Sequence, residues 1–83
     1  MSNIDKKLEN LNHQIYEKLK NLKILLQEKT SIMERYKLAS PAQKVLIEKE
    51  MLQSKEKFEI LSKEVDFLTD EITKLKNETS IDN

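Results

Sequence analysis

The fold is decided by one short stretch near the middle of the chain, residues 37–43, with the sequence KLASPAQ. Ser40 can cap the amino end of a helix, and Gln43 stands three residues later, where its amide can reach back to the backbone of Ser40. Pro41 takes the first helical position, where its missing N–H leaves no hydrogen bond unmade. Proline also pushes the residue before it out of the α region, so an earlier helix has to end by about residue 38. The stretch therefore predicts a turn over about 38–41 between two helices.

Apolar residues recur at spacings of three and four on both sides of this turn, which is the pattern of amphipathic helices. Before the turn, Ser2 and Asp5 form a second capping pattern, and the periodicity predicts a first helix over about 3–38. After the turn it predicts a second helix over about 41–77, so that residues 1–77 form the hairpin and residues 78–83 a flexible tail. The expected inward row of the second helix is Ile47, Met51, Ser54, Phe58, Leu61, Val65, Leu68, Ile72 and Leu75.

The apolar positions of the two helices mirror each other about residue 40, because six pairs of residue numbers each add up to 80. A connection of about three residues obliges neighbouring helices to lie antiparallel. The sequence therefore predicts an all-α fold, an antiparallel two-helix hairpin with a coiled-coil-like seam. The alternative is one continuous helix kinked at Pro41. The pairs are Leu8 with Ile72, Ile15 with Val65, Leu19 with Leu61, Leu22 with Phe58, Leu26 with Ser54, and Met33 with Ile47; Leu25 and Ile32 are expected to flank this seam.

The composition limits the possible classes of protein. The 83 residues include no Gly, no Cys, no Trp and one Pro, while Lys, Glu, Leu and Ile dominate, as in long helices and coiled coils. Without cysteine there is no disulfide and no thiolate metal site, which is compatible with a reducing compartment. No apolar run approaches the roughly 20 residues that span a bilayer, and no secretory leader is visible. We therefore expect no membrane insertion and a cytoplasmic location.

Charge is balanced overall but divided between the halves. Residues 1–39 carry eight basic and five acidic side chains, a net charge of +3, and residues 40–83 carry seven basic and ten acidic ones, a net charge of −3. Opposite signs favour docking of one half on the other. Proteins that bind nucleic acid normally show a basic excess on one face, so we expect no nucleic-acid partner.

The sequence offers little for catalysis. His13 is the only histidine and falls on the solvent side of the first helix, whereas a metal site needs several convergent donors. The carboxylates of the second helix interleave with lysines, as on a solvated helix face. A glycine-rich phosphate loop is impossible without glycine. We therefore expect no enzyme activity, no catalytic or metal-binding residue, no cofactor and no small-molecule substrate.

Several apolar residues lie outside the seam that one hairpin can bury. In the second helix, Ile60 and Phe67 are one heptad apart and Leu46 lies two heptads before Ile60, so they form a row on the far side. Leu52 and, in the first helix, Ile24 also lie outside the seam. We expect these five residues to bind a protein partner: the hairpin either dimerises into a four-helix bundle or covers a partner's amphipathic helix. This predicts a non-enzymatic interaction module, an adaptor or chaperone.

Residues 62–66, with the sequence SKEVD, resemble the SQELD signature of the small helical-hairpin aspartyl-phosphate phosphatases that restrain bacterial sporulation. The resemblance implies that Asp66 would be inserted at the phosphoryl site of a response regulator. In this alternative the protein is an aspartyl-phosphate phosphatase.

The size and hairpin form are also similar to those of the helical chaperones and subunits of type III secretion needles, which bury amphipathic helices against one another. The turn here lacks the two prolines typical of the needle subunits. The resemblance therefore implies a needle chaperone or co-chaperone, as a second alternative drawn from architecture.

Overall fold

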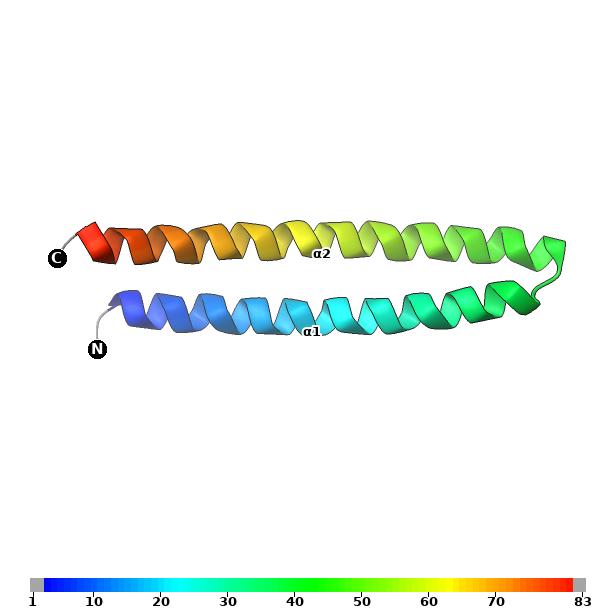
Figure 1. Ribbon diagram of the computed structural model, residues 1–83, viewed down its shortest axis with the longest axis horizontal. Helices are drawn as coiled ribbons and strands as arrows, with labels where there is room; N and C mark the ends of the chain where they lie inside the picture. The colour runs from blue at the N-terminus through cyan, green and yellow to red at the C-terminus, as the bar shows by residue number, and fades with distance from the viewer. Residues whose placement is uncertain (1–2, 82–83) are drawn as a thin grey trace.

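The computed structural model describes residues 3–81, with the side chains of residues 3–78, and consists of two long α-helices (Figure 1). Helix α1 spans Asn3–Leu38 and helix α2 spans Pro41–Ile81. They lie side by side and antiparallel, so the start of α1 and the end of α2 are at the same end of the molecule. The predicted hairpin is confirmed. Helix α2 continues about one turn beyond the expected end near residue 77, and residues 82–83 of the expected tail lie outside the described residues.

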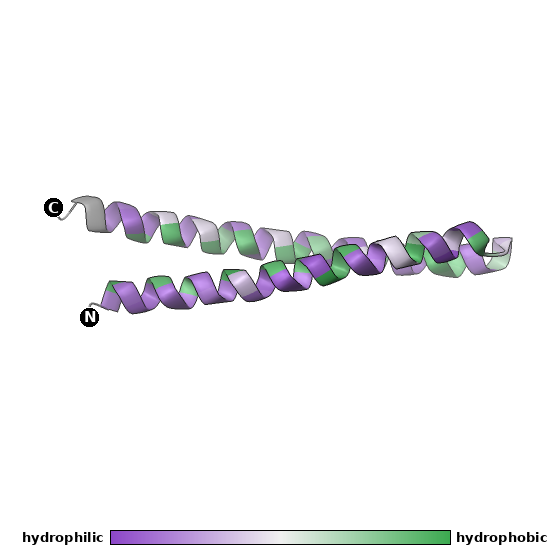
Figure 2. Ribbon diagram, turned by 60° about the horizontal axis from the view of Figure 1, so that its bottom comes forward, coloured by the Kyte–Doolittle hydropathy of each residue, from purple (hydrophilic) through white to green (hydrophobic). Residues whose placement is uncertain are grey.

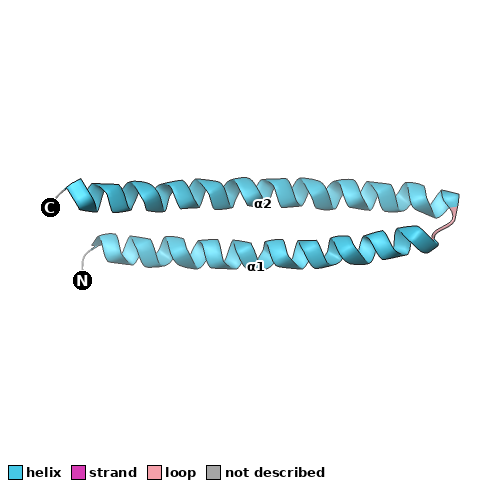
Figure 3. Ribbon diagram, in the orientation of Figure 1, coloured by secondary structure: helices cyan, strands magenta, loops and turns pink. Residues whose placement is uncertain are grey.

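A short loop joins the two helices (Figure 3), and it has the capping chemistry expected from the sequence. The backbone N–H of Gln43 donates to Ser40 Oγ at 3.3 Å, and the backbone N–H of Ser40 donates to Gln43 Oε1 at 3.1 Å. The N–H of Lys44 donates to the carbonyl of Ser40 at 2.8 Å, which is the first hydrogen bond of α2. The N–H of Ala39 donates to the carbonyl of Tyr36 at 3.2 Å and closes the end of α1. These reciprocal bonds set α2 as a separate helix rather than a continuation of α1.

Helix α2 turns the predicted apolar row toward α1. Every residue of that row is buried or half-buried, and Ile47 and Leu68 expose only 9% and 7% of their surface. The register predicted for the second helix is confirmed.

Helix α1 departs from the predicted register by one residue over its middle. Three residues expected in the seam are 45–50% exposed, and the residue that precedes each of them faces α2 instead. The prediction was wrong here because two rows offset by one residue are both largely apolar. Only the inward row stays in phase with Ile4 and Leu11 at a period of 3.5 residues, so that the whole helix contacts α2 along one line. The exposed residues are Leu19, Leu26 and Met33; the inward ones are Lys18, Leu25 and Ile32, of which Ile32 is 6% exposed.

The hairpin is elongated and leaves much of its surface open. It measures 64 × 17 × 13 Å, and its radius of gyration is 18.8 Å, against about 12 Å for a compact domain of this length. It exposes 6807 Å², whereas a compact protein of 9.8 kDa exposes about 5,200 Å². Apolar segments alternate with polar ones along both helices (Figure 2). The chain on its own therefore exposes more surface than a compact domain of the same mass.

Within the described residues, neither helix contains a stretch that is long and apolar enough to cross a lipid bilayer.

Candidate interaction surfaces

One broad side of the hairpin carries a groove of about 440 Å³ between the two helices. Leu26 of α1 and Leu52 of α2 line it, and they are 50% and 57% exposed. Leu19 and Met33 lie one heptad to either side of Leu26, and Val45 lies one heptad before Leu52. Leu19, Met33 and Val45 therefore lie on the same side of the hairpin as the groove. We call these five residues the groove face. Three residues of the groove face come from α1 and two from α2.

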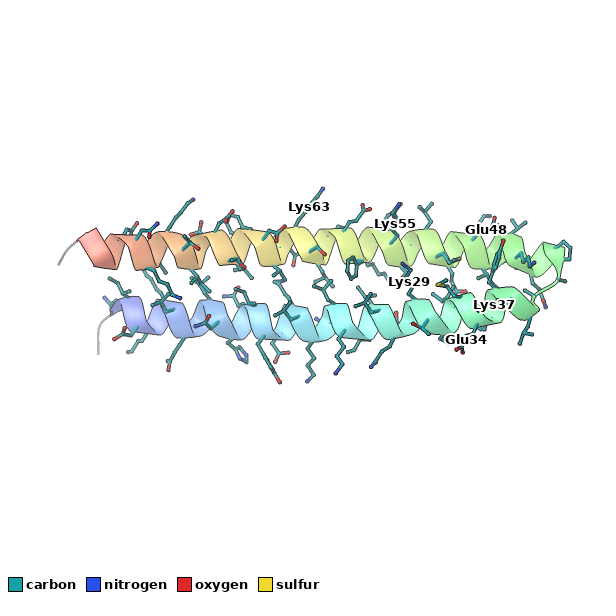
Figure 4. The ribbon with its side chains drawn as sticks, viewed as in Figure 1. Lys29, Glu34, Lys37, Glu48, Lys55 and Lys63 are labelled. Carbon is teal, nitrogen blue, oxygen red and sulfur yellow. The ribbon has the colours of Figure 1, made fainter. Side chains whose placement is uncertain are left out.

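Charged side chains of both signs border this groove. Lys29, Glu48 and Lys55 all line it, and Figure 4 shows Lys29 between the two helices, whereas Lys63 points away from α1. Lys29 occupies a seam position of α1 but is exposed, because its long side chain extends out of the seam toward solvent. The groove therefore combines an apolar lining with a rim of mixed charge.

The other broad side carries a smaller groove of about 360 Å³, lined by Ile24 of α1 and Ile60 of α2. Ile24 and Leu26 are two residues apart on one helix, a rotation of about 200°, so they lie on opposite sides of Leu25. Phe67 lies one heptad after Ile60 and Leu46 two heptads before it, and both therefore extend this side. We call Ile24, Leu46, Ile60 and Phe67 the opposite face.

The five residues predicted to bind a partner are all exposed, from 45% for Ile24 to 65% for Leu46. They do not form one patch, because Leu52 lies on the groove face and the other four lie on the opposite face. The sequence missed the contribution of α1 to the groove face, since Leu19, Leu26 and Met33 were expected in the seam. The positions of Ile4 and Leu11 could have revealed it. A row that continues from them every seven residues passes through Lys18, Leu25 and Ile32, and so leaves Leu19, Leu26 and Met33 outside the seam.

Two ion pairs between the helices lie on the side of the opposite face. Lys18 donates a hydrogen bond to Glu64, and Arg35 pairs with Glu50 at 3.2 Å. Glu50 and Glu64 are one heptad to either side of Lys57, which lines the smaller groove. Both pairs join a basic residue of α1 to an acidic residue of α2. Arg35 and Glu50 are exposed, and an exposed pair contributes about 0.2–1 kcal/mol, whereas Lys18 and Glu64 are half-buried. These pairs favour packing of α1 against α2, as the opposite net charges of the two halves of the sequence predict.

Near the turn, Tyr36 joins the two helices. Its hydroxyl donates to Glu48 Oε1 at 3.1 Å, and Lys44 Nζ lies 5.1 Å from the centre of its ring. The hydrogen bond to Glu48, and then the negative charge of that carboxylate, raise the pKa of Tyr36 above its usual value of 10.0. A raised pKa means that folding favours the neutral phenol, so this contribution to stability is complete below pH 10 and is lost as pH rises through the higher pKa.

We expect the replacement of Glu48 by Ala to lower the pKa of Tyr36, because it removes both the hydrogen bond and the charge. The measurement is an absorbance titration at alkaline pH in a Tyr16→Phe background, in which Tyr36 is the only tyrosine. Glu50→Ala is the matched control, since that carboxylate pairs with Arg35 instead. Equal titration midpoints for Glu48→Ala and its parent would contradict the contact.

Asp66, the residue singled out by the phosphatase resemblance, is exposed on α2, two heptads after Leu52. The structure does not test that role, which stays a prediction. His13 is exposed on α1, and among the described residues no group of His, Cys, Asp and Glu could hold a metal ion.

No protein-family model, no curated protein and no solved structure matches this chain.

Proposed function

We propose that this protein is a non-enzymatic, cytoplasmic protein–protein interaction module, which acts as an adaptor or chaperone by packing its exposed apolar faces against amphipathic helices. The helices can belong to a second copy or to another protein. This is the helix-in-groove mode of recognition, in which apolar side chains at helical spacing fill a groove between helices.

The observation that carries the proposal is the amount of apolar surface that one hairpin leaves open. Eleven large apolar side chains are at least 45% exposed, whereas Ile32, Ile47 and Leu68 are the buried apolar residues among those described. The exposed area exceeds that of a compact protein of the same mass by about 1,600 Å². Exposed apolar side chains that gather on one face mark interaction sites in soluble proteins, whereas single exposed apolar residues do not. Helix partners would cover these patches.

The test is the solution mass, measured by light scattering across a dilution series, with helicity recorded on the same samples. We expect a mass above the 9.8 kDa of one chain that falls on dilution, together with the helicity. Loss of helicity is expected because an isolated pair of helices buries little apolar surface. A hairpin that stays monomeric and fully helical at every concentration, and that does not bind an apolar dye such as ANS, would contradict the proposal.

A further inference from the structure

We infer that the groove face binds a second copy of this chain, with both turns at the same end, so that α1 of each copy lies over α2 of the other. The inference rests on the proposed function and specifies its occupant and geometry. The result is a four-helix bundle with a twofold axis parallel to the helices, in which every neighbouring pair of helices is antiparallel.

The groove face suits a second copy better than the opposite face does, because both helices contribute apolar side chains to it. Leu19, Leu26 and Met33 come from α1, and Val45 and Leu52 come from α2. On the opposite face α2 supplies Leu46, Ile60 and Phe67, whereas the matching row of α1 is apolar at Ile24 and Leu38 and polar at Asn10, Glu17 and Ser31. A second copy would therefore set Ile60 and Phe67 near the levels of Glu17 and Asn10. An isologous interface requires a surface that complements itself, and on the groove face Leu26 and Met33 of one copy can meet Leu52 and Val45 of the other.

The position of these residues along the hairpin decides the orientation of the two copies. They occupy residues 19–33 and 45–52, in the half of the hairpin nearer the turn. With both turns at one end, Leu26 lies near the level of Leu52 of the second copy, and Met33 near that of Val45. With the turns at opposite ends and the hairpins fully overlapped, the same apolar half would meet the open end, where the groove side carries Asn12 and Asp66.

Charge favours the same orientation. Helix α1 carries eight basic and five acidic residues, a net charge of +3, and α2 carries seven basic and nine acidic residues, a net charge of −2. With the turns at one end, each α1 lies over the α2 of the other copy, so that unlike charges meet. With the turns at opposite ends, α1 would lie over α1 and α2 over α2, and like charges would repel.

The available area is sufficient for a stable dimer. A side of 64 × 17 Å sets an upper limit of about 1,100 Å² per copy, or about 2,200 Å² in total. The half nearer the turn, which carries the apolar residues, offers about half of this total, which reaches the roughly 1,000 Å² that a specific interface needs.

The experiment is disulfide cross-linking between single-cysteine variants, which the absence of natural cysteine makes specific. Leu26→Cys and Leu52→Cys are prepared separately, mixed, dissociated, reassociated and oxidised, and the same is done with Ile24→Cys and Ile60→Cys as the matched pair on the opposite face. A disulfide requires Cα atoms within about 7 Å. We expect a cross-linked dimer as the main product of the Leu26 and Leu52 mixture, and at least tenfold less from either variant alone or from the control mixture.

Each other outcome overturns the inference in a distinct way. Cross-linking of Leu26→Cys with itself would place α1 over α1, with the turns at opposite ends and the hairpins overlapping mainly in their halves nearer the turn. Cross-linking of the Ile24 and Ile60 mixture would place the dimer on the opposite face. An oligomeric mass without any of these cross-links would overturn the geometry and leave the proposed function standing, whereas a monomeric, helical hairpin that binds no apolar dye would overturn both.

Discussion

Replacing Leu68 by Ala lowers the free energy of unfolding by about 3 kcal/mol, as is typical for a buried leucine whose loss leaves a cavity. Leu68 is 7% exposed and is one of three buried apolar side chains among the described residues. With so little buried, the hairpin has few contacts that could compensate for the loss. The measurement is urea unfolding followed by circular dichroism, at one fixed protein concentration for all variants.

Phe67→Ala is the matched control, because it removes a larger apolar side chain from the adjacent position on the same helix. Phe67 is 64% exposed, and alanine is the better helix former, so we expect a change of less than about 1 kcal/mol. A larger loss of stability for Phe67→Ala than for Leu68→Ala would contradict the structure, because it would show that the row of Phe67, and not that of Leu68, packs against α1.

The combined replacement of Leu26 and Leu52 by Gln abolishes self-association of the hairpin. A symmetric dimer contains four of these side chains, and burial of each contributes about 2 kcal/mol. Even half of that total weakens association about a thousandfold. Glutamine is a good helix former, so the substitutions do not disfavour the helices themselves. The measurement is the dissociation constant from light scattering or sedimentation equilibrium.

The matched control is the double replacement of Ile60 and Phe67 by Gln, which removes the same number of large apolar side chains from the opposite face. We expect it to change the dimer dissociation constant by less than about tenfold, since one kcal/mol corresponds to a factor of about five. If the control pair abolishes association and the Leu26 and Leu52 pair does not, the opposite face carries the dimer, as the sequence alone suggests.

Most of the fold could be predicted because the relevant signals are local. The capping exchange between Ser40 and Gln43 involves residues three apart, and the fixed φ of Pro41 acts within its own residue. The seam of α2 was predicted in full because the adjacent row of Leu46, Ile60 and Phe67 is interrupted by Gln53 and Lys74, so it cannot form a continuous apolar seam. The candidate site was predicted only in part: all five expected residues are exposed, but the division into two faces was missed.

The amino-acid sequence by itself determined that this chain forms two helices, where the turn between them lies, and that the helices return antiparallel. Only the tertiary structure decided which of two adjacent apolar rows of α1 faces α2. Ile32 and Met33 are neighbours of similar hydrophobicity, yet they are 6% and 45% exposed. The choice depends on the phase of the whole helix against its partner, since a straight seam has to include Ile4 and Leu11 as well. That constraint puts Lys18 in the seam and leaves Leu19, Leu26 and Met33 on the groove face.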